Sequence, residues 1–566
     1  MSSISIGTFF SQCFFKIPKY QRGYAWEQDH VRELFEDIKE SIESGSNHYI
    51  GTMVLAKGDD DAQYYVVDGQ QRITTLTMII NALIKRLSAE EASFYKRCYI
   101  KDPKGYRLVP LGRDQAFFFG LLEGENQIPD NKSQRLLSQA HTEITSTIEL
   151  IPNPKEFLES VEKLELMRFI EPSEGDAIRI FQTVNDRGKA LSNMEKIKSL
   201  LIYFSNRYLN KALDSKINDR FSDMFEYYDD ISQTGDELGI ALIKSRSFSE
   251  DNLMRYHFVT YYPGEYEPTA EGVLTFVKKD LSELRKKVIS GETQPLFEYI
   301  DRYSQSLCDF FSHCKNVTEK AKTIPQYYKL FVILGLSATL YPLITKLEMK
   351  NLLDKPLINP NMVGYTFLDL VELIDVRVYK TRGTDPRKDI ANIVYNIDNT
   401  PVGKLEEQLT WFNTAWMPRE LFLSNLSGNM YHNEATTHIL LTYSESMHKE
   451  GYTIDTLKTI VSQKPTKEHI LSQKIDFTPE TLGFKDDHDF DAHKGWLGNL
   501  TILESKLNTG ALNKNILEKL PFYDQSQFLL TKKTATLLNM KKTFSKIDLH
   551  ERTREIANYC VDKWRC

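Results

Sequence analysis

The chain has 566 residues, of which 41% are hydrophobic and 11% are aromatic, and this length predicts about three or four folding units. The composition excludes a single small module and a chain that is disordered throughout. The formal net charge of −7 excludes a uniformly basic coat for nucleic acid, because phosphate binding needs clustered Lys and Arg.

The cysteines and the apolar stretches bear on where the protein works. The chain has 6 Cys and no CxxC pair, which argues against a disulfide framework or a structural zinc site. The N-terminus lacks a basic region before an apolar run of signal-peptide length. The longest apolar stretch, residues 330–344, contains Pro342 and is shorter than the roughly 20 residues that cross a bilayer. We therefore expect a cytoplasmic protein without membrane contact, in which this stretch is a buried helix.

Strand and helix signals alternate over the first part of the chain. In chain order we expect a helix over 31–42, strands over 48–55 and 64–67, and a helix over 73–87. A further pair of helices is expected over 176–203, joined by an Asn-Asp-Arg-Gly turn. Ser192 is the expected cap of the second of these helices, with Glu195 at its third position.

The rest of the chain has mostly helical patterns. Residues 206–400 show aromatic-rich helices without residues arranged for chemistry, so we expect a helical connector there. Further helices follow, and then come a polar, His-containing stretch at 467–515 and a basic C-terminus. Residues 505–566 carry a net charge of +6, which leaves −13 on the remainder. Any contact with nucleic acid must therefore rest on local patches.

The sequence Asp68-Gly69-Gln70-Gln71-Arg72 lies where a predicted strand ends and a predicted helix begins. Free backbone N–H groups and the positive end of the helix dipole can bind an anion at such a position. Gly69 allows close backbone approach, the two Gln side chains add hydrogen-bonding groups, and Arg72 can form two bonds to one phosphate. Asp68 can hold a divalent ion or orient a water. The alternative is an ordinary hairpin-like turn with a surface Arg.

Two other segments favour phosphate chemistry at this turn. Residues 17–26 combine aromatic, Arg and Gln side chains that no amphipathic period explains, and residues 181–188 place Arg beside Gly in a second turn. Together with the Asp-Gly-Gln-Gln-Arg turn, they resemble the GmrS-type domain of the GmrSD modification-dependent restriction enzymes. The resemblance covers residues 1–205 and implies a ParB/sulfiredoxin-like domain that binds and hydrolyses nucleoside triphosphates.

The same resemblance implies which residues contact the nucleotide, which can be GTP, UTP or ATP. It assigns nucleotide contacts to Asp68, Gly69, Gln70, Gln71 and Arg72. It places another set in the same pocket or on an adjoining surface that senses DNA, namely Tyr20, Gln21, Arg22, Asn185, Arg187 and Gly188.

A second group of residues suits phosphodiester hydrolysis, which needs a base, a cation and groups that hold the base in place. His469 can act as the general base, because an ordinary pKa of about 6.5 leaves it largely neutral in the cytosol. Glu468 and Asn508 offer oxygen ligands for Mg²⁺ or Mn²⁺. The amide of Asn499 can fix the imidazole. The alternative is a chance pattern, with Asn499 simply in a turn.

These residues also carry a resemblance. The matching residues are Glu-His-Ile at 468–470, Gly-Asn-Leu-Thr-Ile-Leu at 498–503, Asn508, Asn513 and Lys519. They are similar to the GmrD-type C-terminal domain, a ββα-metal nuclease of the His-Asn-His (HNH) kind, over residues 401–566. The chain departs from relatives at Ser472, where they commonly carry Pro.

The surroundings of this second group give two further expectations. The long gap between His469 and Asn499 predicts an insertion around 486–493, whose histidines, His488 and His493, we expect to be exposed in a loop. Lysines overlap the site, and we expect contact with the DNA backbone from Lys519 first, because it falls on a family position, and from Lys514. Lysines that only solvate helix surfaces are the alternative.

The combined prediction is an α+β, predominantly helical chain with three parts. These are a ParB/sulfiredoxin-like nucleotide-binding and DNA-sensing domain at 1–205, a helical connector at 206–400, and an HNH-like nuclease domain embedded in helices at 401–566. The expected function is a nucleotide-regulated, metal-dependent DNA endonuclease of anti-phage defence that restricts modified phage DNA. A ParB-like DNA-binding protein without cleavage and an RNA-cleaving toxin with the same site stay open, as do a homodimer and partner defence proteins.

Overall fold

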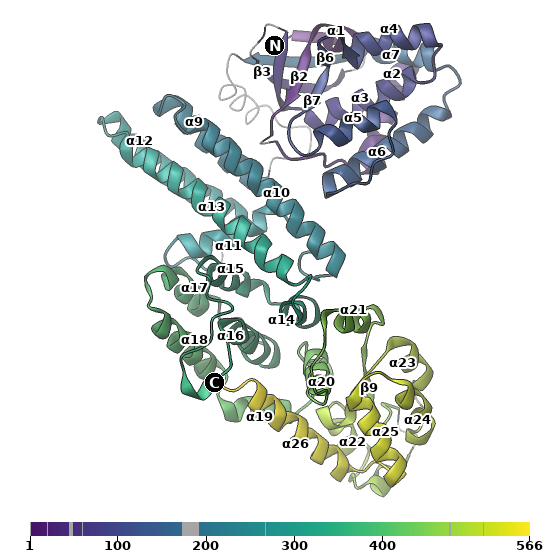
Figure 1. The fold of residues 1–566 in the computed structure, drawn as a ribbon, viewed down its shortest axis with the longest axis vertical. Helices are drawn as coiled ribbons and strands as arrows, with labels where there is room; N and C mark the ends of the chain where they lie inside the picture. The colour runs from purple at the N-terminus through teal and green to yellow at the C-terminus, as the bar shows by residue number, and fades with distance from the viewer. Residues whose placement is uncertain are drawn as a thin grey trace. The chain divides into compact units, whose positions relative to one another are not determined.

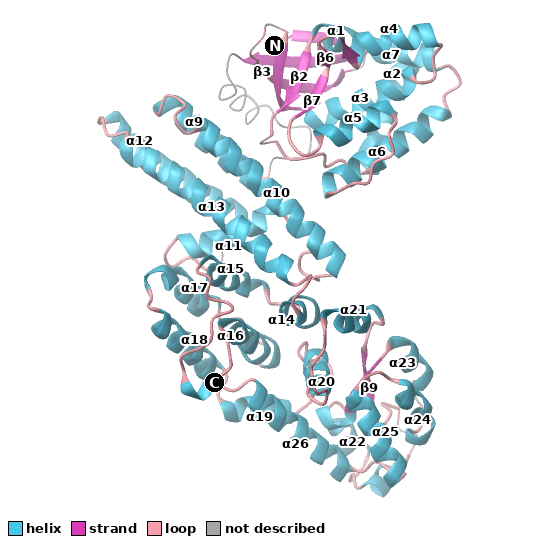
Figure 2. Cartoon of the chain, in the orientation of Figure 1, coloured by secondary structure: helices cyan, strands magenta, loops and turns pink. Residues whose placement is uncertain are grey.

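The computed structural model describes residues 2–19, 21–44, 49–58, 60, 62–171, 192–266, 268–474, 477–512 and 514–566. Within these residues the chain is mostly helical, with one six-stranded sheet and two sheets of two strands (Figure 1, Figure 2). The predicted α+β, predominantly helical class is confirmed.

The chain divides into two compact units. The first comprises Met1–Gln233, Ser249–Met254 and Thr269–Phe311, and the second comprises Thr234–Phe248, Arg255–Pro268 and Ser312–Cys566. Residues 206–400, the predicted connector, are thus shared between the two units.

The first unit contains a mixed sheet with the strand order β1-β8-β3-β4-β2-β7. Its strands are β1 (Ser2–Ser5), β2 (Phe14–Ile17), β3 (Tyr49–Lys57), β4 (Gln63–Asp68), β7 (Leu108–Pro110) and β8 (Glu165–Glu171). β3 pairs antiparallel with β4 and parallel with β8, whereas β2 pairs parallel with β4 and β7. The strands predicted before the Asp-Gly turn are therefore neighbours. A separate pair is formed by β5 (Lys101–Asp102) and β6 (Gly105–Tyr106).

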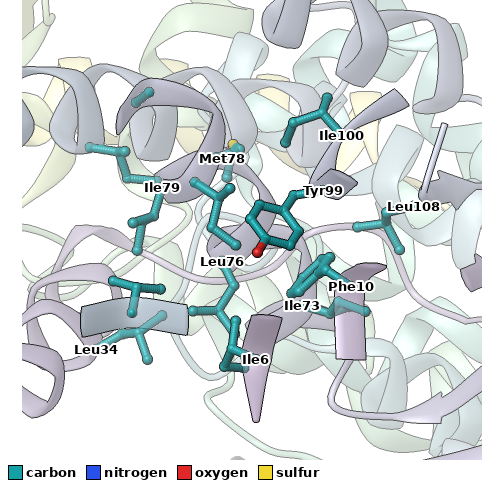
Figure 3. Packing of buried hydrophobic residues seen from close by; sticks show 14 of the residues in the cluster. Ile6, Phe10, Leu34, Ile73, Leu76, Met78, Ile79, Tyr99, Ile100 and Leu108 are labelled. Carbon is teal, nitrogen blue, oxygen red and sulfur yellow. The ribbon is translucent and has the colours of Figure 1, made fainter. Parts of the chain in front are cut away.

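Seven helices pack with this sheet in the described part of residues 1–171. They are α1 (Ile6–Gln12), α2 (Gln28–Ser44), α3 (Gln70–Ile84), α4 (Ala89–Tyr99), α5 (Gln115–Glu123), α6 (Lys132–Glu149) and α7 (Pro154–Lys163). Every residue of α3 except Arg72 is buried. Figure 3 shows Ile73, Leu76 and Ile79 of α3 in the cluster that also contains Ile6 and Leu34. Each such side chain stabilises the fold by roughly 1.5–3 kcal/mol, so the start of α3 is firmly held.

Long helices complete the first unit and lead into the second. They are α9 (Asn193–Tyr208), α10 (Asp214–Leu238), α11 (Glu250–Tyr261), α12 (Ala270–Ile289) and α13 (Gln294–Lys320) (Figure 1). Ser192 caps α9 and Glu195 completes the capping box, as predicted. The helix predicted before them, within residues 176–191, lies outside the described residues.

The second unit is built mainly of short helices. Up to residue 462 they are α14 (Pro325–Tyr328), η1 (Lys329–Leu334), η2 (Ala338–Leu340), α15 (Tyr341–Met349), η3 (Pro360–Met362), α16 (Phe367–Ile374), η4 (Asp375–Thr381), α17 (Arg387–Asn396), η5 (Ile397–Asn399), α18 (Val402–Trp416), α19 (Arg419–Leu426), α20 (Thr436–Glu445) and α21 (Ile454–Ser462). The apolar stretch 330–344 is largely buried but is not one helix, because Gly335 adopts φ 72° and ends η1 before α15 begins. Among the described helices, none is long and apolar enough to cross a membrane.

The last part of the second unit contains a small antiparallel sheet between helices. Its elements are β9 (Thr466–His469), η6 (Pro479–Leu482), α22 (Asp487–His493), η7 (Leu497–Asn499), β10 (Leu500–Leu503), α23 (Ser505–Ala511), α24 (Ile516–Gln525), α25 (Leu529–Lys541) and α26 (Lys546–Lys563). β9 pairs with β10, and a hydrophobic cluster that includes Ile470, Phe490, Leu503, Tyr523 and Leu549 lies beside them.

Candidate functional sites

The small sheet brings together the residues expected to cut a phosphodiester. β9 and β10 pair antiparallel with His469 opposite Leu500, and α23 follows β10 after a single residue. Glu468 and His469 end the first strand, Asn499 directly precedes the second, and Asn508 lies on the helix. The result is a strand–strand–helix unit that carries all four predicted residues.

His469 lies almost entirely inside this unit, with 6% of the residue exposed. Its Nδ1 is 3.1 Å from Nε2 of Gln473, and its ring centroid is 4.3 Å from that of Tyr431. An amide can turn over to present either its oxygen or its NH₂ group, so Gln473 can hold either tautomer of the imidazole. When Gln473 accepts from Nδ1–H, the lone pair of Nε2 is available to take a proton.

The pKa of His469 is lowered to about 3, first by burial and next by the charge of Lys519. Lys494, His432 and Lys467 act in the same direction. The imidazole is therefore neutral at pH 7, as a general base must be. The lysines among these groups give the surroundings a positive character that suits a phosphate group.

Asn499 holds the chain that follows His469. Its Oδ1 accepts from the backbone N–H of Leu471 at 2.8 Å, and its Nδ2 donates to the carbonyl oxygens of Leu471 at 3.2 Å and Lys494 at 2.8 Å. The prediction that the Asn499 amide fixes the imidazole itself is therefore wrong, because these backbone groups use its hydrogen-bonding capacity. Asn499 acts on His469 through the loop.

The two predicted metal ligands differ in availability. Nδ2 of Asn508 donates to Oγ1 of Thr466 at 2.7 Å, while its Oδ1 has no hydrogen-bond partner among the described residues and is free for a cation. Glu468 is 6% exposed, and its Oε1 lies 2.8 Å from Nζ of Lys519. A metal ion at Glu468 must therefore replace Lys519 as its counter-charge. In the described part of the chain, no three His, Cys, Asp or Glu side chains lie together as a metal site.

Lys519 is not a surface residue. It is 1% exposed, and besides its ion pair with Glu468 it donates to the carbonyl oxygen of His469 at 2.6 Å. The prediction that Lys519 contacts the DNA backbone is therefore wrong, because its ammonium group holds the end of β9 from within the fold. Lys514 is exposed, with its ammonium group 4.6 Å from the ring centre of Phe522, and its contact with DNA stays a prediction.

The Asp-Gly turn of the first unit joins β4 directly to α3. Gly69 has φ 92°, in the left-handed region, and a Cβ there would lie 2.0 Å from Sδ of Met53. Glycine alone meets both constraints. The N–H groups of the first turn of α3 therefore lie where β4 ends, and the helix dipole favours an anion at this point.

Hydrogen bonds tie the segment after residue 20 to this turn. Oε1 of Gln71 accepts from the N–H of Ala25 at 2.8 Å, and its Nε2 donates to the carbonyl oxygen of Gly23 at 3.1 Å. Nε2 of Gln21 donates to the carbonyl oxygen of Val67 at 3.0 Å. Both side chains thus hold the backbone together, whereas the resemblance implied a nucleotide contact for Gln71 and a place in the same pocket or on an adjoining DNA-sensing surface for Gln21. Nη1 of Arg72 donates to the carbonyl oxygen of Thr52 at 3.2 Å.

Asp68 is placed for proton transfer near neutral pH. Burial raises its pKa to about 6, although the Gly69 N–H group and Arg72 partly oppose the shift. Arg22 also lowers this pKa, and its Nε lies 3.7 Å from Oε1 of Glu195. Carboxyl, guanidinium and helix N-terminus thus meet at one point. The other residues predicted here, Tyr20, Asn185, Arg187 and Gly188, lie outside the described residues.

Two family models match the chain, and each covers one of these sites. Residues 3–202 match the N-terminal domain of the GmrSD restriction endonuclease, and residues 418–559 match the C-terminal domain of GmrSD restriction endonucleases. The chain belongs to the GmrSD restriction endonuclease family. It is therefore an enzyme that acts on DNA, and the predicted family is confirmed. None of the curated proteins compared with the chain matches it.

The GmrSD C-terminal match begins just before a loop that the sequence pattern did not single out. Between α19 and α20, the N–H groups of Met430 and Tyr431 both donate to the carbonyl oxygen of Gly495, at 2.8 Å and 3.1 Å. This attachment brings Tyr431 to the His469 ring, and Nζ of Lys467 lies 5.2 Å from the Tyr431 ring centre. The adjacent Tyr431 and His432 of this loop could have pointed to the site. They lie far from His469 along the chain, so the sequence pattern did not connect them with it.

The expected insertion is a helix and not an exposed loop. α22 covers most of it, and His488 is exposed as predicted. His493 is not, since its Nδ1 lies 3.3 Å from Oδ1 of Asp489 and its ring lies 4.5 Å from that of Trp496. The expectation for His493 is therefore wrong, because the aromatic side chains beside it draw it into the fold.

Proposed function

We propose that this GmrSD protein is a nucleotide-regulated, metal-dependent DNA endonuclease of anti-phage defence, which cuts modified phage DNA in the cytoplasm. The observation that carries the catalytic part is the neutral, nearly buried His469 with lysine charges around it. A neutral imidazole can take a proton from water, and fixed positive charges can stabilise a phosphate as it gains negative charge. The combination suits an HNH-like hydrolysis of a phosphodiester.

The chain's own groups have distinct tasks in this hydrolysis. His469 removes a proton from the attacking water at Nε2, while Gln473 holds Nδ1. Lys467 balances the charge of the phosphate, and Lys494 adds to this when its ion pair with Asp491 opens. A Mg²⁺ or Mn²⁺ ion, when bound, supplies charge stabilisation at the leaving oxygen. Asn508 offers one oxygen ligand for this ion, and Glu468 offers a second only when its ion pair with Lys519 opens.

The regulatory part of the proposal rests on the start of α3. Its N–H groups, with Arg22 and Arg72 nearby, favour the phosphates of GTP, UTP or ATP. Asp68, whose pKa is about 6, can accept a proton from a water that attacks the terminal phosphate. Nucleotide occupancy then controls cleavage, because an ungated nuclease would damage the host's own DNA.

A cleavage assay with His469→Ala tests the catalytic part. The substrate is a panel of modified phage DNAs, incubated with Mg²⁺ or with EDTA and with or without each triphosphate. We expect His469→Ala to lower the cleavage rate about 100-fold or more, because a general base typically contributes that factor. His488→Ala, which removes an exposed histidine from the same domain, is the matched control and should cut like the wild type.

Two results would contradict this assignment. The first is unchanged metal-dependent cleavage by His469→Ala, which would move the base elsewhere. The second is intact supercoiled plasmid and phage DNA for the wild type under every condition, which would favour a DNA-binding protein without cleavage.

A further inference from the structure

A small pocket lies beside the first turn of α3 in the first unit. Its volume is about 70 Å³, which is room for roughly five to seven water molecules at 10–15 Å³ each. Pro18 and Phe225 contribute apolar walls, and Gln70, Asp114 and Asp229 contribute polar groups. A pocket with apolar walls and a few convergent polar groups is typical of a ligand site. This volume suits one small ring and is far too small for a nucleoside triphosphate.

The walls of this pocket are fixed before any ligand arrives. The N–H of Tyr24 donates to Oγ of Ser133 at 2.6 Å, and this hydroxyl donates to Oδ2 of Asp114 at 2.5 Å. From α10, Oγ of Ser222 donates to the carbonyl oxygen of Lys19 at 2.9 Å. A ligand therefore meets a preorganised site and loses little affinity to the ordering of loops.

Gln70 is one polar group of the pocket that the fold itself leaves unused. The residue is 9% exposed, and among the described residues its side-chain amide has no hydrogen-bond partner. The adjacent Gln71, by contrast, makes two hydrogen bonds to backbone groups. The amide lines the pocket without a protein partner, so its donors and its acceptor are available to a ligand.

We propose that this pocket binds the edge of a nucleobase, with the Gln70 amide reading its hydrogen-bonding pattern. An amide offers one acceptor and two donors and can form paired bonds to a base edge. The carboxyl groups of Asp114, Glu226 and Asp229 line the pocket together with the cations of Lys19, Arg22 and Arg113, so its charges are balanced and do not favour a phosphate over a neutral base edge. The inference rests on the proposed nucleotide site, since the phosphates would stay outside at the N–H groups of α3 while the base enters the pocket.

Asp229 strengthens the fit to a base. Burial and the nearby charge of Asp114 raise its pKa to about 7, so both forms of the carboxyl are populated at neutral pH. Asp114 is held by Ser133 and by Nδ2 of Asn131, which is 3.3 Å from its Oδ1. Asp229 has no hydrogen-bond partner among the described residues, and it can donate or accept. Gln70 and Asp229 thus present matching groups from two walls.

The base can come from a free nucleoside triphosphate or from an unstacked base of DNA, and binding measurements separate these sources. The first arm measures binding of the full chain to ATP, GTP, CTP and UTP and to inorganic tripolyphosphate. Gln70→Glu is nearly isosteric, but it replaces the NH₂ donor of the base-reading amide by a negatively charged acceptor at the first residue of α3. We expect it to change the affinity ratio between the best and the poorest base about tenfold, whereas its added charge weakens tripolyphosphate and all four triphosphates by one common factor.

The second arm uses duplex DNA that carries 2-aminopurine, whose fluorescence rises when the base leaves the stack. An increase with the wild type that is lost in Gln70→Glu would identify DNA as the source. Asp229→Asn is a second isosteric variant, and it should change the result of the same arm as Gln70→Glu does. Gln28→Glu makes the same charge change at an exposed position of the same unit and should behave like the wild type in both arms.

The possible failures are distinguishable. If nucleotides bind but Gln70→Glu weakens all four and tripolyphosphate alike, or weakens none, the base pocket is overturned while the nucleotide site stands. If neither nucleotides nor tripolyphosphate bind the wild type, the proposed nucleotide site fails. In that case the pocket survives only if 2-aminopurine fluorescence still depends on Gln70, and it is overturned if it does not.

Discussion

The environment of the His469 side chain sets how cleavage should depend on pH. Burial and neighbouring cations lower its pKa to about 3, so the neutral form persists when the pH falls from 8 to 5. We therefore expect no loss of the base in this range in single-turnover cleavage, measured as kcat/KM against pH. An acid limb centred near the ordinary histidine pKa of about 6.5 would show that the ring is solvated in the free enzyme.

Asp68 is the control for this profile, because the same pH range titrates it. Its pKa is raised to about 6, so acidification protonates it and removes an acceptor from the proposed nucleotide site. An acid limb that requires nucleotide and disappears in Asp68→Asn belongs to Asp68 and leaves the His469 assignment intact. The pKa of the Asp68 carboxyl is raised and the pKa of the His469 imidazole is lowered for one reason, since burial disfavours the charged form of each group.

Residue roles were harder to predict from sequence than residue identities. Glu468, His469, Asn499 and Asn508 were all chosen correctly as members of one unit, because strand and helix patterns there are local. Asn499 binds Leu471, which lies 28 residues away along the chain, and Lys519 binds the carbonyl oxygen of His469, which lies 50 residues away. Contacts at such separations depend on tertiary packing, so the sequence could not show that Asn499 binds backbone or that Lys519 is buried.

Among the elements, α26 determines where Asn499 stands. Nη1 of Arg552 donates to the carbonyl oxygens of Gly498 at 2.6 Å and Leu500 at 3.3 Å, one on each side of Asn499. Oγ1 of Thr553 accepts from the N–H of Gly498 at 2.9 Å. A Cβ on Gly498 would lie 1.9 Å from the carbonyl oxygen of Leu549, so α26 and η7 meet too closely for any other residue. Arg552 is thus a positioning residue for the loop that Asn499 holds.

Substitution of Arg552 should therefore slow the chemical step. We expect Arg552→Met to lower the single-turnover cleavage rate about tenfold or more with little change in KM for DNA, because small misplacements of catalytic groups are costly. Arg552→Lys, which keeps the charge and one direction of hydrogen bonding, should recover part of the rate. Arg554→Met alters an exposed arginine on the same helix and is the matched control. A variant that loses thermal stability alone, with the rate unchanged, would make Arg552 purely structural.

The elements around the Asp-Gly turn were predictable because each signal is local. β3, β4 and α3 follow the expected alternation and helical spacing, and the Ser192 capping box is a short motif. The break in the stretch 330–344 was not predictable, since Gly335 ends the helix in a left-handed conformation that an apolar pattern does not reveal. The spacing of residues alone left open whether the Asp-Gly turn binds phosphate, and the family resemblance is what favoured that interpretation.

For the whole molecule, charge decides how firmly DNA is held before a specific contact is made. The chain carries −7 overall, and several basic side chains near the nuclease residues are already paired. Lys533 lies 2.6 Å from Glu555, Lys494 lies 2.7 Å from Asp491, and Lys519 is buried against Glu468. Lysines that are already paired with carboxylates release few counterions from DNA when the protein binds it.

Unmodified DNA should accordingly bind weakly and with a shallow salt dependence. In fluorescence anisotropy we expect a slope of log K against log salt shallower than about −4, because only a few phosphates are neutralised. Glu555→Gln combined with Asp491→Asn frees Lys533 and Lys494, and it should tighten binding and steepen the slope by up to about 2. Glu271→Gln combined with Glu283→Gln removes the same charge from α12 and controls for net charge alone. Tight, salt-resistant binding of the wild type to unmodified DNA would contradict gated recognition, since the enzyme would then occupy host DNA without discrimination.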